Sequence, residues 1–274
     1  MLTLEPFGDV TRVRMSHALS RAVGYDVSAY LYRGVLVDSG YPLAAAAVAR
    51  FLAERRPAGV VVTHQHEDHA GNVELVARLG IPLLAAAATL DAVRRPERIG
   101  FYRRAIWGSR PPLVSPVVPF EPEGLTLLPT PGHSDDHHVL WDPDTATVFG
   151  GDAFLGVKVK VAHPWEDPRQ IAASARRVAA LRPRRLFDAH RGSVDNPVDA
   201  LLAKADWIDE TVSAIERRAA AGWDERAISR AVLGREDLAA WISFGDYSRE
   251  NFVRAVLRTG AESGARGAES RTGG

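Results

Sequence analysis

The feature that constrains this chain most is an apolar run that ends in a dense group of histidines and acids. The run Val60-Val61-Val62 leads through Thr63 into HQHEDH, residues 64–69, which places three histidines and two acids in six positions. A buried strand gains nothing from such groups, because a polar side chain without a partner is costly to bury. They therefore either face solvent in an ordinary loop or converge on a ligand. The chain has nine histidines in 274 residues, and three in one loop favour convergence.

Three later strand ends carry residues of the same kind. His133 closes PTPGH after an expected strand and a Pro-Gly turn, and His190 closes LFDAH after another. Asp152 follows Gly150-Gly151 in VFGGD, where two glycines allow another group to approach the backbone closely. Rigid strands position the loops at their ends, so a shared site at one edge of the fold is expected.

The composition limits which ligands such a site offers. The chain contains no cysteine, so a metal ion would be held by histidine and carboxylate alone. In an extended segment His64 and His66 point to the same side, and Asp68 follows them as the inward-facing acid. Three histidines and a carboxylate exceed what one tetrahedral zinc with an open water position accepts, which favours two metals. Gln65 and Glu67 alternate outward and are interpreted as solvated.

The pattern along the chain predicts a layered α/β architecture, because expected strands and helices alternate. Strands are expected over residues 10–15, 27–37 with a turn at Gly34, 59–63, 82–87, 125–128, 139–141, 147–149 and 185–187. Helices are expected over residues 43–56, 71–79 and 168–181 and through most of the chain from residue 197. The composition of residues 261–274 predicts a disordered tail.

Residues 88–122 interrupt this alternation with arginines, prolines and aromatics, and are interpreted as a surface excursion. Phe101, Tyr102 and Trp107 could serve there as a lid over a substrate or as anchors to the core. The run GVKVKV after Asp152 alternates like a strand, which would place Lys158 and Lys160 on one face. A cationic contact for a substrate and a solvated edge strand are both open for these lysines.

Charge and hydropathy set expectations about partners. The chain has 34 basic and 34 acidic residues and a pI near 7.2, so no global field favours nucleic acid or a membrane surface. No apolar run approaches 18 residues and no secretory signal is evident, which predicts a soluble, cytoplasmic protein with a small-molecule substrate. A homodimer through the apolar faces of residues 197–221 and 249–257 is an open alternative.

Four motifs in order make residues 10–195 resemble the metallo-β-lactamase fold superfamily. They are T-H-x-H-x-D-H at Thr63–His69, P-G-H at 131–133, G-D at 151–152 and the late His190. The resemblance implies a four-layer αββα sandwich as a domain over residues 1–196, with a binuclear site at one edge. A helical extension over residues 197–260 would follow this domain.

The resemblance also implies seven metal ligands. The first metal would take His64, His66 and His133, the second would take Asp68, His69 and His190, and Asp152 would bridge them. Two zinc ions are expected, although such ligands also accept iron or manganese. Asp38, Thr63 and Ser134 are expected to support the ligands through hydrogen bonds, as is one of the pair His137 and His138.

Such a site supports hydrolysis by a metal-bridging hydroxide. Asp68 and Asp152 are the expected catalytic carboxylates, with Asp68 orienting the proton of the nucleophile. Residues 197–258 resemble the helical extension of the glyoxalase II and thioesterase branch, which implies an acyl thioester or a similar small ester as substrate. Lys158 and Tyr247 are candidate substrate contacts.

Other activities remain open on the same residues. Lactone and phosphoester hydrolysis use the same site, but lactonases of the superfamily usually have a tyrosine where this chain has Ala153-Phe154-Leu155. A mononuclear iron oxygenase of the persulfide dioxygenase type would use His64, His66, His133 and Asp152 alone. A binding protein on a vestigial site is disfavoured, because all seven ligand positions are filled.

Overall fold

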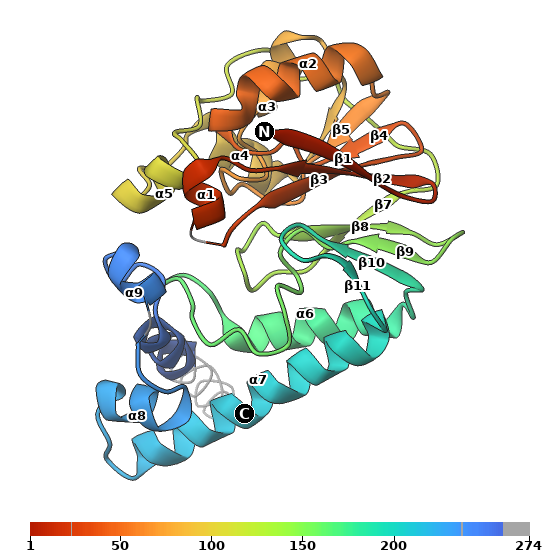
Figure 1. Ribbon diagram of the computed structural model, residues 1–274. Coiled ribbons are helices and arrows are strands. Elements are labelled where there is room, and N and C mark those ends of the chain that lie inside the picture. Colours follow the sequence, from red (N-terminus) through yellow and green to blue (C-terminus); the bar gives the residue numbers. More distant parts are fainter. Residues whose placement is uncertain (23, 237, 260–274) are drawn as a thin grey trace, which may run out of the picture.

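Two β-sheets packed face to face form the centre of the fold in the computed structural model, which describes residues 1–22, 24–236 and 238–259 (Figure 1). The first sheet runs in chain order: β1 (Leu2–Phe7), β2 (Val10–Met15), β3 (Val27–Tyr32), β4 (Val35–Val37), β5 (Gly59–Val61) and β6 (Leu83–Leu84). The second has the order β11 (Gly192–Val194), β10 (Arg185–Asp188), β9 (Thr147–Phe149), β8 (His138–Asp142) and β7 (Thr126–Pro129). The expected tail at 261–274 lies outside the described residues.

Parallel pairing occurs at three places in the sheets. Strand β5 lies parallel to both β4 and β6, and β9 lies parallel to β10, whereas the other pairs are antiparallel. The carboxyl ends of β5, β9 and β10 lead into the metal-ligand loops. The topology therefore places these loops at one edge of the sandwich.

The layer between the sheets is apolar and aromatic. The rings of Tyr30 and Phe187 lie 5.3 Å apart and those of Phe149 and Phe187 lie 5.5 Å apart. The Tyr30 hydroxyl donates a 2.6 Å hydrogen bond to the Asp188 carbonyl, so its polar end is satisfied across the two sheets. The sheets are thus fixed to each other next to the strand ends that carry the site.

Helices cover the outer faces of both sheets (Figure 1). The first sheet is covered by α2 (Ala45–Arg55), α3 (Val73–Arg78) and α4 (Ala87–Arg94), and the second by α6 (Pro168–Ala180) and α7 (Pro197–Ala220). This arrangement confirms the expected αββα sandwich. The remaining helices are α1 (Ala18–Ala22), η1 (Pro42–Ala44), α5 (Phe101–Ile106), α8 (Glu225–Val232) and α9 (Leu238–Ile242), and residues 249–259 are also helical.

Local signals explain where the helices of the second layer begin. The Asp167 side chain caps α6 by accepting from the backbone N–H groups of Arg169 and Gln170, and a proline follows at the first helical position. Helix α7 also begins with proline and buries the stripe Leu201, Ala205, Ile208, Val212 and Ile215 at helical spacing. No helix among the described residues is long and apolar enough to cross a membrane.

Three expectations about local structure were wrong. The strand expected over 82–87 shrinks to Leu83–Leu84, because α4 begins at Ala87. Residues 88–122 are not a surface excursion: they contain α4 and α5, and Val93, Ile106, Trp107 and Leu113 are buried in the core on the first sheet.

The third error concerns the run GVKVKV, which forms no strand. Alternation alone does not make a strand without a neighbouring ladder, and the residue after this run, Ala162, forms just an isolated bridge to Ser248. Lys158 and Lys160 are exposed on an irregular segment. Among the aromatics of residues 88–122, Trp107 is buried and acts as an anchor, whereas Phe101 is 68% exposed.

A buried lysine on α7 gives the fold a testable pH dependence. The Lys204 ammonium donates a 2.5 Å hydrogen bond to the Phe154 carbonyl, and burial lowers its pKa from 10.5 to about 8, although Asp188, Glu166 and Asp152 oppose the shift. The folded state then binds fewer protons than the unfolded state between these two pH values. The resulting destabilisation is complete below pH 8 and is relieved as the pH rises towards 10.5.

We therefore expect the free energy of unfolding of the wild type, relative to Lys204→Met, to rise by about 2 kcal/mol between pH 7.5 and 10. Urea unfolding of both proteins at the two pH values measures this difference. A difference that does not change with pH would mean that the Lys204 ammonium reaches solvent in the folded protein.

Candidate metal centre

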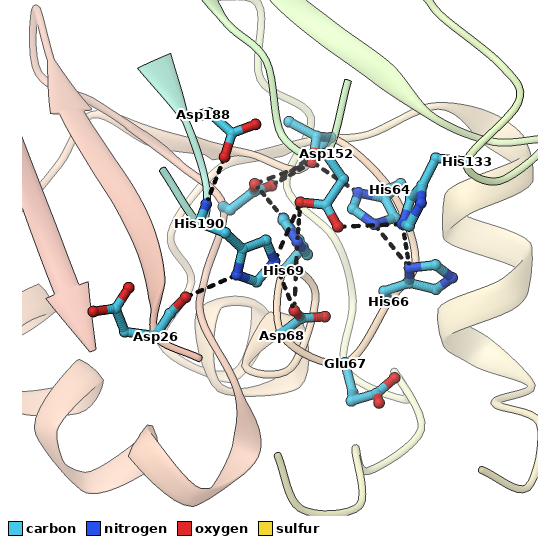
Figure 2. A network of polar contacts seen from close by, with 12 residues as sticks. Asp26, His64, His66, Glu67, Asp68, His69, His133, Asp152, Asp188 and His190 are labelled. Atoms are coloured by element: carbon cyan, nitrogen blue, oxygen red, sulfur yellow. Dashed lines mark hydrogen bonds and ion pairs between the residues drawn. The ribbon is translucent and has the colours of Figure 1, made fainter. Parts of the chain in front are cut away.

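Seven histidine and aspartate side chains converge at one edge of the sandwich (Figure 2). The loop after β5 supplies His64, His66, Asp68 and His69, and the ends of β7, β9 and β10 supply His133, Asp152 and His190. All seven positions expected from the sequence are thus brought together, each following a strand.

The first donor group consists of His64, His66, His133 and Asp152, which offer atoms within 4.8 Å of one another. The Nδ1 atom of His66 lies 3.0 Å from His64 Nε2 and 3.0 Å from His133 Nε2. Three imidazole nitrogens and a carboxylate oxygen therefore face a common point. This is a donor set that zinc, iron or manganese accepts.

The second donor group consists of Asp68, His69 and His190, also within 4.8 Å of one another. Asp68 Oδ2 lies 3.4 Å from His190 Nε2 and 3.7 Å from His69 Nε2. These three residues lie directly beside the first group (Figure 2).

Asp152 lies between the two groups. One carboxylate oxygen, Oδ2, is 3.2 Å from His133 Nε2, and the other, Oδ1, is 3.2 Å from His69 Nε2 and 3.4 Å from His190 Nε2. Its position requires glycine just before it: Gly151 has a φ of 51°, and a Cβ there would lie 2.8 Å from Thr63 Oγ1. Asp152 therefore presents one oxygen to each group, as a bridging ligand would.

The donors fit a cation better than they fit each other. His69 Nε2 and Asp152 Oδ1 are buried and, although they lie 3.2 Å apart, neither has a partner with hydrogen-bond geometry within the described part of the chain. Buried polar atoms are normally paired, so two orphaned ligand atoms facing a common point are the signature of a site built for an ion.

The electrostatics agree with this interpretation. Burial lowers the pKa of His64 and His66 well below 6.5, so both imidazoles are neutral and able to ligate. At His69 and His190 burial also opposes charge, but the Asp152 and Asp68 carboxylates outweigh it and raise the pKa well above 6.5. Without metal, protons on these histidines balance the carboxylates, and a bound cation would displace them.

Hydrogen bonds at the opposite ring nitrogens hold the ligand histidines in place. Nδ1 of His69 donates to Asp38 at 2.8 Å, and Nδ1 of His190 donates to the Asp26 carbonyl at 2.8 Å. The remaining pairs are His133 Nδ1 with Glu166 Oε1 at 3.2 Å and His64 Nδ1 with Thr63 Oγ1 at 3.0 Å. Such contacts fix the tautomer and aim the other nitrogen at the metal.

Asp38 is the central support of the loop after β5. Its carboxylate accepts from the Thr63 backbone N–H at 2.8 Å and from the Thr63 hydroxyl at 3.0 Å, in addition to His69. Asp38 has a φ of 64°, a left-handed conformation that is uncommon outside glycine. The structure thus places Asp38 and Thr63 where the sequence had suggested.

Ser134 acts at one remove from the ligands. Its hydroxyl donates to Asp136 Oδ1 at 2.7 Å, and Asp136 Oδ2 accepts from the Gln65 N–H at 2.8 Å and from the Thr89 hydroxyl at 2.8 Å. Asp136 therefore ties the loop after β7 to the loop after β5. Sequence reasoning missed it, although it lies three residues after His133.

His137 supports Asp152, as expected for one histidine of the pair. Burial lowers the pKa of His137 to about 3, so its ring is neutral, and its Nε2 accepts from the Asp152 N–H at 3.1 Å. Glu166, which precedes α6 and contacts His133, was also missed. Its position beside the helix cap gave no signal of a role at the site.

The interpretation of Glu67 as solvated was wrong. Glu67 points away from the cluster (Figure 2), but it is only 3% exposed and is held by Arg103 of α5, itself 7% exposed. Arg103 Nε lies 2.6 Å from Oε1 of Glu67, and its Nη2 lies 2.5 Å from Oε2, a bidentate pair. Helix α5 folds back over the loop, and this contact between residues 36 positions apart has no local sequence signature.

A cavity of about 290 Å³ opens above the cluster. Five of the seven candidate ligands form part of its lining, all except His64 and His69. Its walls are largely apolar and aromatic, with Tyr25, Tyr102, Ile106, Trp107, Leu155, Leu238, Ile242 and Tyr247. Tyr247 thus lies where a substrate contact was expected, whereas Lys158 does not line this cavity. His163 lines it too and stacks on Trp165 with ring centroids 4.5 Å apart.

Breaking the Glu67–Arg103 pair should be costly because it leaves a buried charge uncompensated. We expect Glu67→Gln to lower the free energy of unfolding by about 3–5 kcal/mol, and Glu67→Leu combined with Arg103→Leu to cost less than either single leucine change. Urea unfolding measures both. The matched control is Asp206→Asn, which breaks an exposed ion pair with Arg176 and should cost below about 1 kcal/mol. Equal losses for Glu67→Gln and the control would show that the buried pair is solvated.

Metal binding should release protons. The Asp152 and Glu166 carboxylates overcome the effect of burial and raise the pKa of His133 to about 9, so at pH 7 the metal-free site is protonated there and at His69 and His190. We expect zinc binding to release more than one proton per chain, and zinc affinity to fall as the pH decreases. Calorimetry at pH 7 in two buffers of different ionisation enthalpy counts the protons. Asp152→Asn should release fewer, and zinc binding without proton release would contradict the charge assignment.

Comparisons with known proteins agree with the fold. The profile of the metallo-beta-lactamase superfamily matches residues 22–208. The curated Beta-lactamase-like protein 2 homolog of Caenorhabditis elegans is 24% identical over 208 residues, 68% of this chain and 65% of that protein. The chain therefore spans less than two thirds of the length of this relative.

Solved structures show the same fold. A metallo-beta-lactamase family protein from Thermus thermophilus superposes with a TM-score of 0.65 and 18% identity, covering 94% of both chains. The metallo-beta-lactamase from Pontibacter korlensis has a TM-score of 0.57 and 16% identity over 76% of this chain and 99% of its own. FIM-1 from Pseudomonas aeruginosa, in its mono-zinc form, has a TM-score of 0.55 and 16% identity over 75% of this chain and 95% of its own. The chain belongs to the metallo-beta-lactamase superfamily, with a His/Asp cluster able to bind metal.

Proposed function

We propose that this protein is a hydrolase that uses two zinc ions to cleave an acyl thioester or a similar small ester. The observation that carries the proposal is the pair of donor groups joined by Asp152 at the floor of an apolar cavity. The mono-zinc form of the FIM-1 neighbour supports zinc as the kind of metal.

The distances between the donor atoms indicate which residues would hold each ion. His64, His66 and His133 would hold one ion, Asp68, His69 and His190 the other, and Asp152 would contact both. When bound, the ions would lower the pKa of the water that they hold and polarise the acyl oxygen.

The side chains around the ions would handle protons and exclude solvent. Asp68 lines the cavity floor and can accept a proton from the attacking water and return it to the leaving group. Burial raises the pKa of Tyr102 and of Tyr247 far above 10, so both phenols remain protonated at neutral pH and can donate hydrogen bonds. The aromatic walls keep bulk water from the reacting carbonyl.

The cavity favours an uncharged ester over a phosphoester. Arg103 is the one arginine or lysine among the described lining residues, and its charge is already neutralised by Glu67. A phosphoryl group would therefore find no additional counter-charge in the cavity beyond the ions themselves. Lactone hydrolysis is less favoured, because the chain lacks the tyrosine that lactonases of the superfamily usually have near the position of Leu155.

The second donor group supports a hydrolase over an iron oxygenase. An oxygenase would use only His64, His66, His133 and Asp152 and would leave Asp68, His69 and His190 without a role. Yet the rings of His69 and His190 are both held by hydrogen bonds at Nδ1. The fixed orientation of His69 and His190 supports a second ion.

Metal analysis tests the proposal directly. We expect about two zinc ions per chain in protein purified without added metal, hydrolysis of a hexanoyl thioester, and loss of activity after chelation that zinc restores. Asp152→Ala should lose both metal and activity, because it removes the ligand shared by both groups. Asp135→Ala, an exposed acid beside the site, is the matched control and should retain both. One iron per chain with oxygen consumption would overturn the proposal.

A further inference from the structure

A second pocket of about 600 Å³ adjoins the cavity above the metal cluster. The two share four lining residues: Tyr25, Leu155, His190 and Tyr247. Because His190 is a candidate metal ligand, the junction of the two pockets lies at the cluster itself. A substrate whose scissile bond lies over the ions would therefore extend into both pockets.

The two pockets differ in chemistry. Away from the candidate ligands the cavity is lined largely by aromatic and aliphatic side chains, and its one arginine or lysine among the described residues, Arg103, is paired with Glu67. The second pocket is lined by the exposed cations Lys158, Lys160 and Arg191 and by the half-buried Arg249. Its acid, Asp26, accepts a 2.5 Å hydrogen bond from Arg14 and is thus already neutralised. We refer to it below as the basic pocket.

The two lysines are unusual in this chain. Of 34 basic residues only three are lysines: Lys158, Lys160 and the buried Lys204. Both exposed lysines of the chain therefore line the basic pocket, whereas solvated faces elsewhere use arginine. Neither ammonium makes a hydrogen bond or ion pair with the described residues. A lysine is a flexible point charge suited to phosphate, so these two positions are chemically suited to an anionic group.

The loop that separates the two pockets is held rigidly. Leu155 lies in the left-handed region with a φ of 53°. Its N–H donates to Asp188 Oδ2 at 2.7 Å, and its carbonyl accepts from Arg191 Nε at 2.8 Å. Lys204 holds the preceding carbonyl, that of Phe154, at 2.5 Å. A strained residue persists only where its surroundings determine it, and here it places a side chain at the junction.

We propose that the substrate is a thioester between an apolar acyl group and an anionic, phosphate-bearing thiol, an assignment that rests on the proposed hydrolase function. The acyl chain occupies the aromatic cavity, and the thiol extends past Leu155 to Lys158 and Lys160. In the reaction water forms a C–O bond with the acyl carbon while the C–S bond breaks. The sulfur leaves towards the basic pocket and takes up one of the two protons of water, and the other proton is released to solvent as the acid ionises, so the products are a carboxylate and the phosphate-bearing thiol.

Three thioesters with one acyl group test this assignment: hexanoyl-coenzyme A, S-hexanoylglutathione and the neutral hexanoyl-N-acetylcysteamine. On the zinc-loaded full chain we expect kcat/KM to be at least about tenfold higher for hexanoyl-coenzyme A than for the neutral thioester. Lys158→Ala combined with Lys160→Ala should remove this preference through KM and leave the neutral thioester unaffected. The matched control, Arg50→Ala combined with Arg78→Ala, removes two exposed charges from α2 and α3 and should change neither.

The possible outcomes distinguish recognition of a negatively charged thiol from recognition of phosphate in particular. Equal kcat/KM for the charged and neutral thioesters in the wild type, unchanged in the lysine variant, would overturn the assignment. A lysine-dependent preference for the glutathione thioester would overturn phosphate as the anion and assign the pocket to carboxylates.

A binding measurement keeps this test independent of the proposed function. Adenosine 3′,5′-bisphosphate carries the phosphates without a thiol or an acyl group, and its calorimetric titration reports on the basic pocket alone. We expect binding to the wild type and to the arginine control, weakened by about tenfold in the lysine variant. If no thioester is cleaved, the proposed function fails, and this titration still decides whether the basic pocket binds phosphate. Equal or absent binding in all three proteins would overturn it.

Discussion

The buried carboxylate of Asp152 is the constraint on which the rest of the site depends. A charge in the interior is tolerated only with opposite charge and hydrogen bonds around it, and no single strand supplies these. The sandwich meets the need by ending four strands at one edge, so that histidines from different loops surround both oxygens. Gly151 allows the chain to turn closely beneath Thr63, and His137 holds the Asp152 N–H. The same convergence that balances a carboxylate in the metal-free protein is what a pair of cations requires.

Outside the metal-ligand cluster, buried charges beside the cavity are neutralised in pairs. The pair of Glu67 and Arg103 places two full charges beside the loop that carries the ligands, yet the pair itself adds no net charge to the cavity. Removing one partner would leave the other as a buried charge without a counter-charge. Such pairs are therefore costly to disrupt even where they add little net stability. The consequence is a largely apolar cavity next to a basic pocket in which Lys158 and Lys160 have no ion-pair partner among the described residues. The division of charge between adjoining pockets is what gives the proposed substrate its direction.

The sequence predicts those parts of the site that depend on local pattern. Apolar runs ending in histidine or aspartate identify four strand ends, and the order of the motifs implies the sandwich that the structure has. Contacts between distant segments leave no such pattern. In the sequence Glu67 has the pattern of a solvated acid, but in the structure Arg103 of α5 pairs with it. Asp136 likewise has the pattern of an ordinary loop residue, but its carboxylate accepts a hydrogen bond from the Gln65 N–H. The strand prediction for GVKVKV fails for the opposite reason: its alternation is typical of a strand, but no described strand pairs with it.

Two non-glycine residues in the left-handed region, Asp38 and Leu155, lie beside the cluster and its cavity, and at both the tertiary contacts take precedence over local preference. Asp38, with a φ of 64°, directs one carboxylate to Thr63 and His69 together. Leu155, with a φ of 53°, is held by hydrogen bonds on both its N–H and its carbonyl, and its side chain lies between the two pockets. Such conformations cost about 1–3 kcal/mol each and survive only where the surrounding contacts determine them. Asp38 fixes the orientation of a candidate ligand, and Leu155 fixes the boundary between the two pockets, so rigidity is concentrated where the proposed substrate would have to be placed.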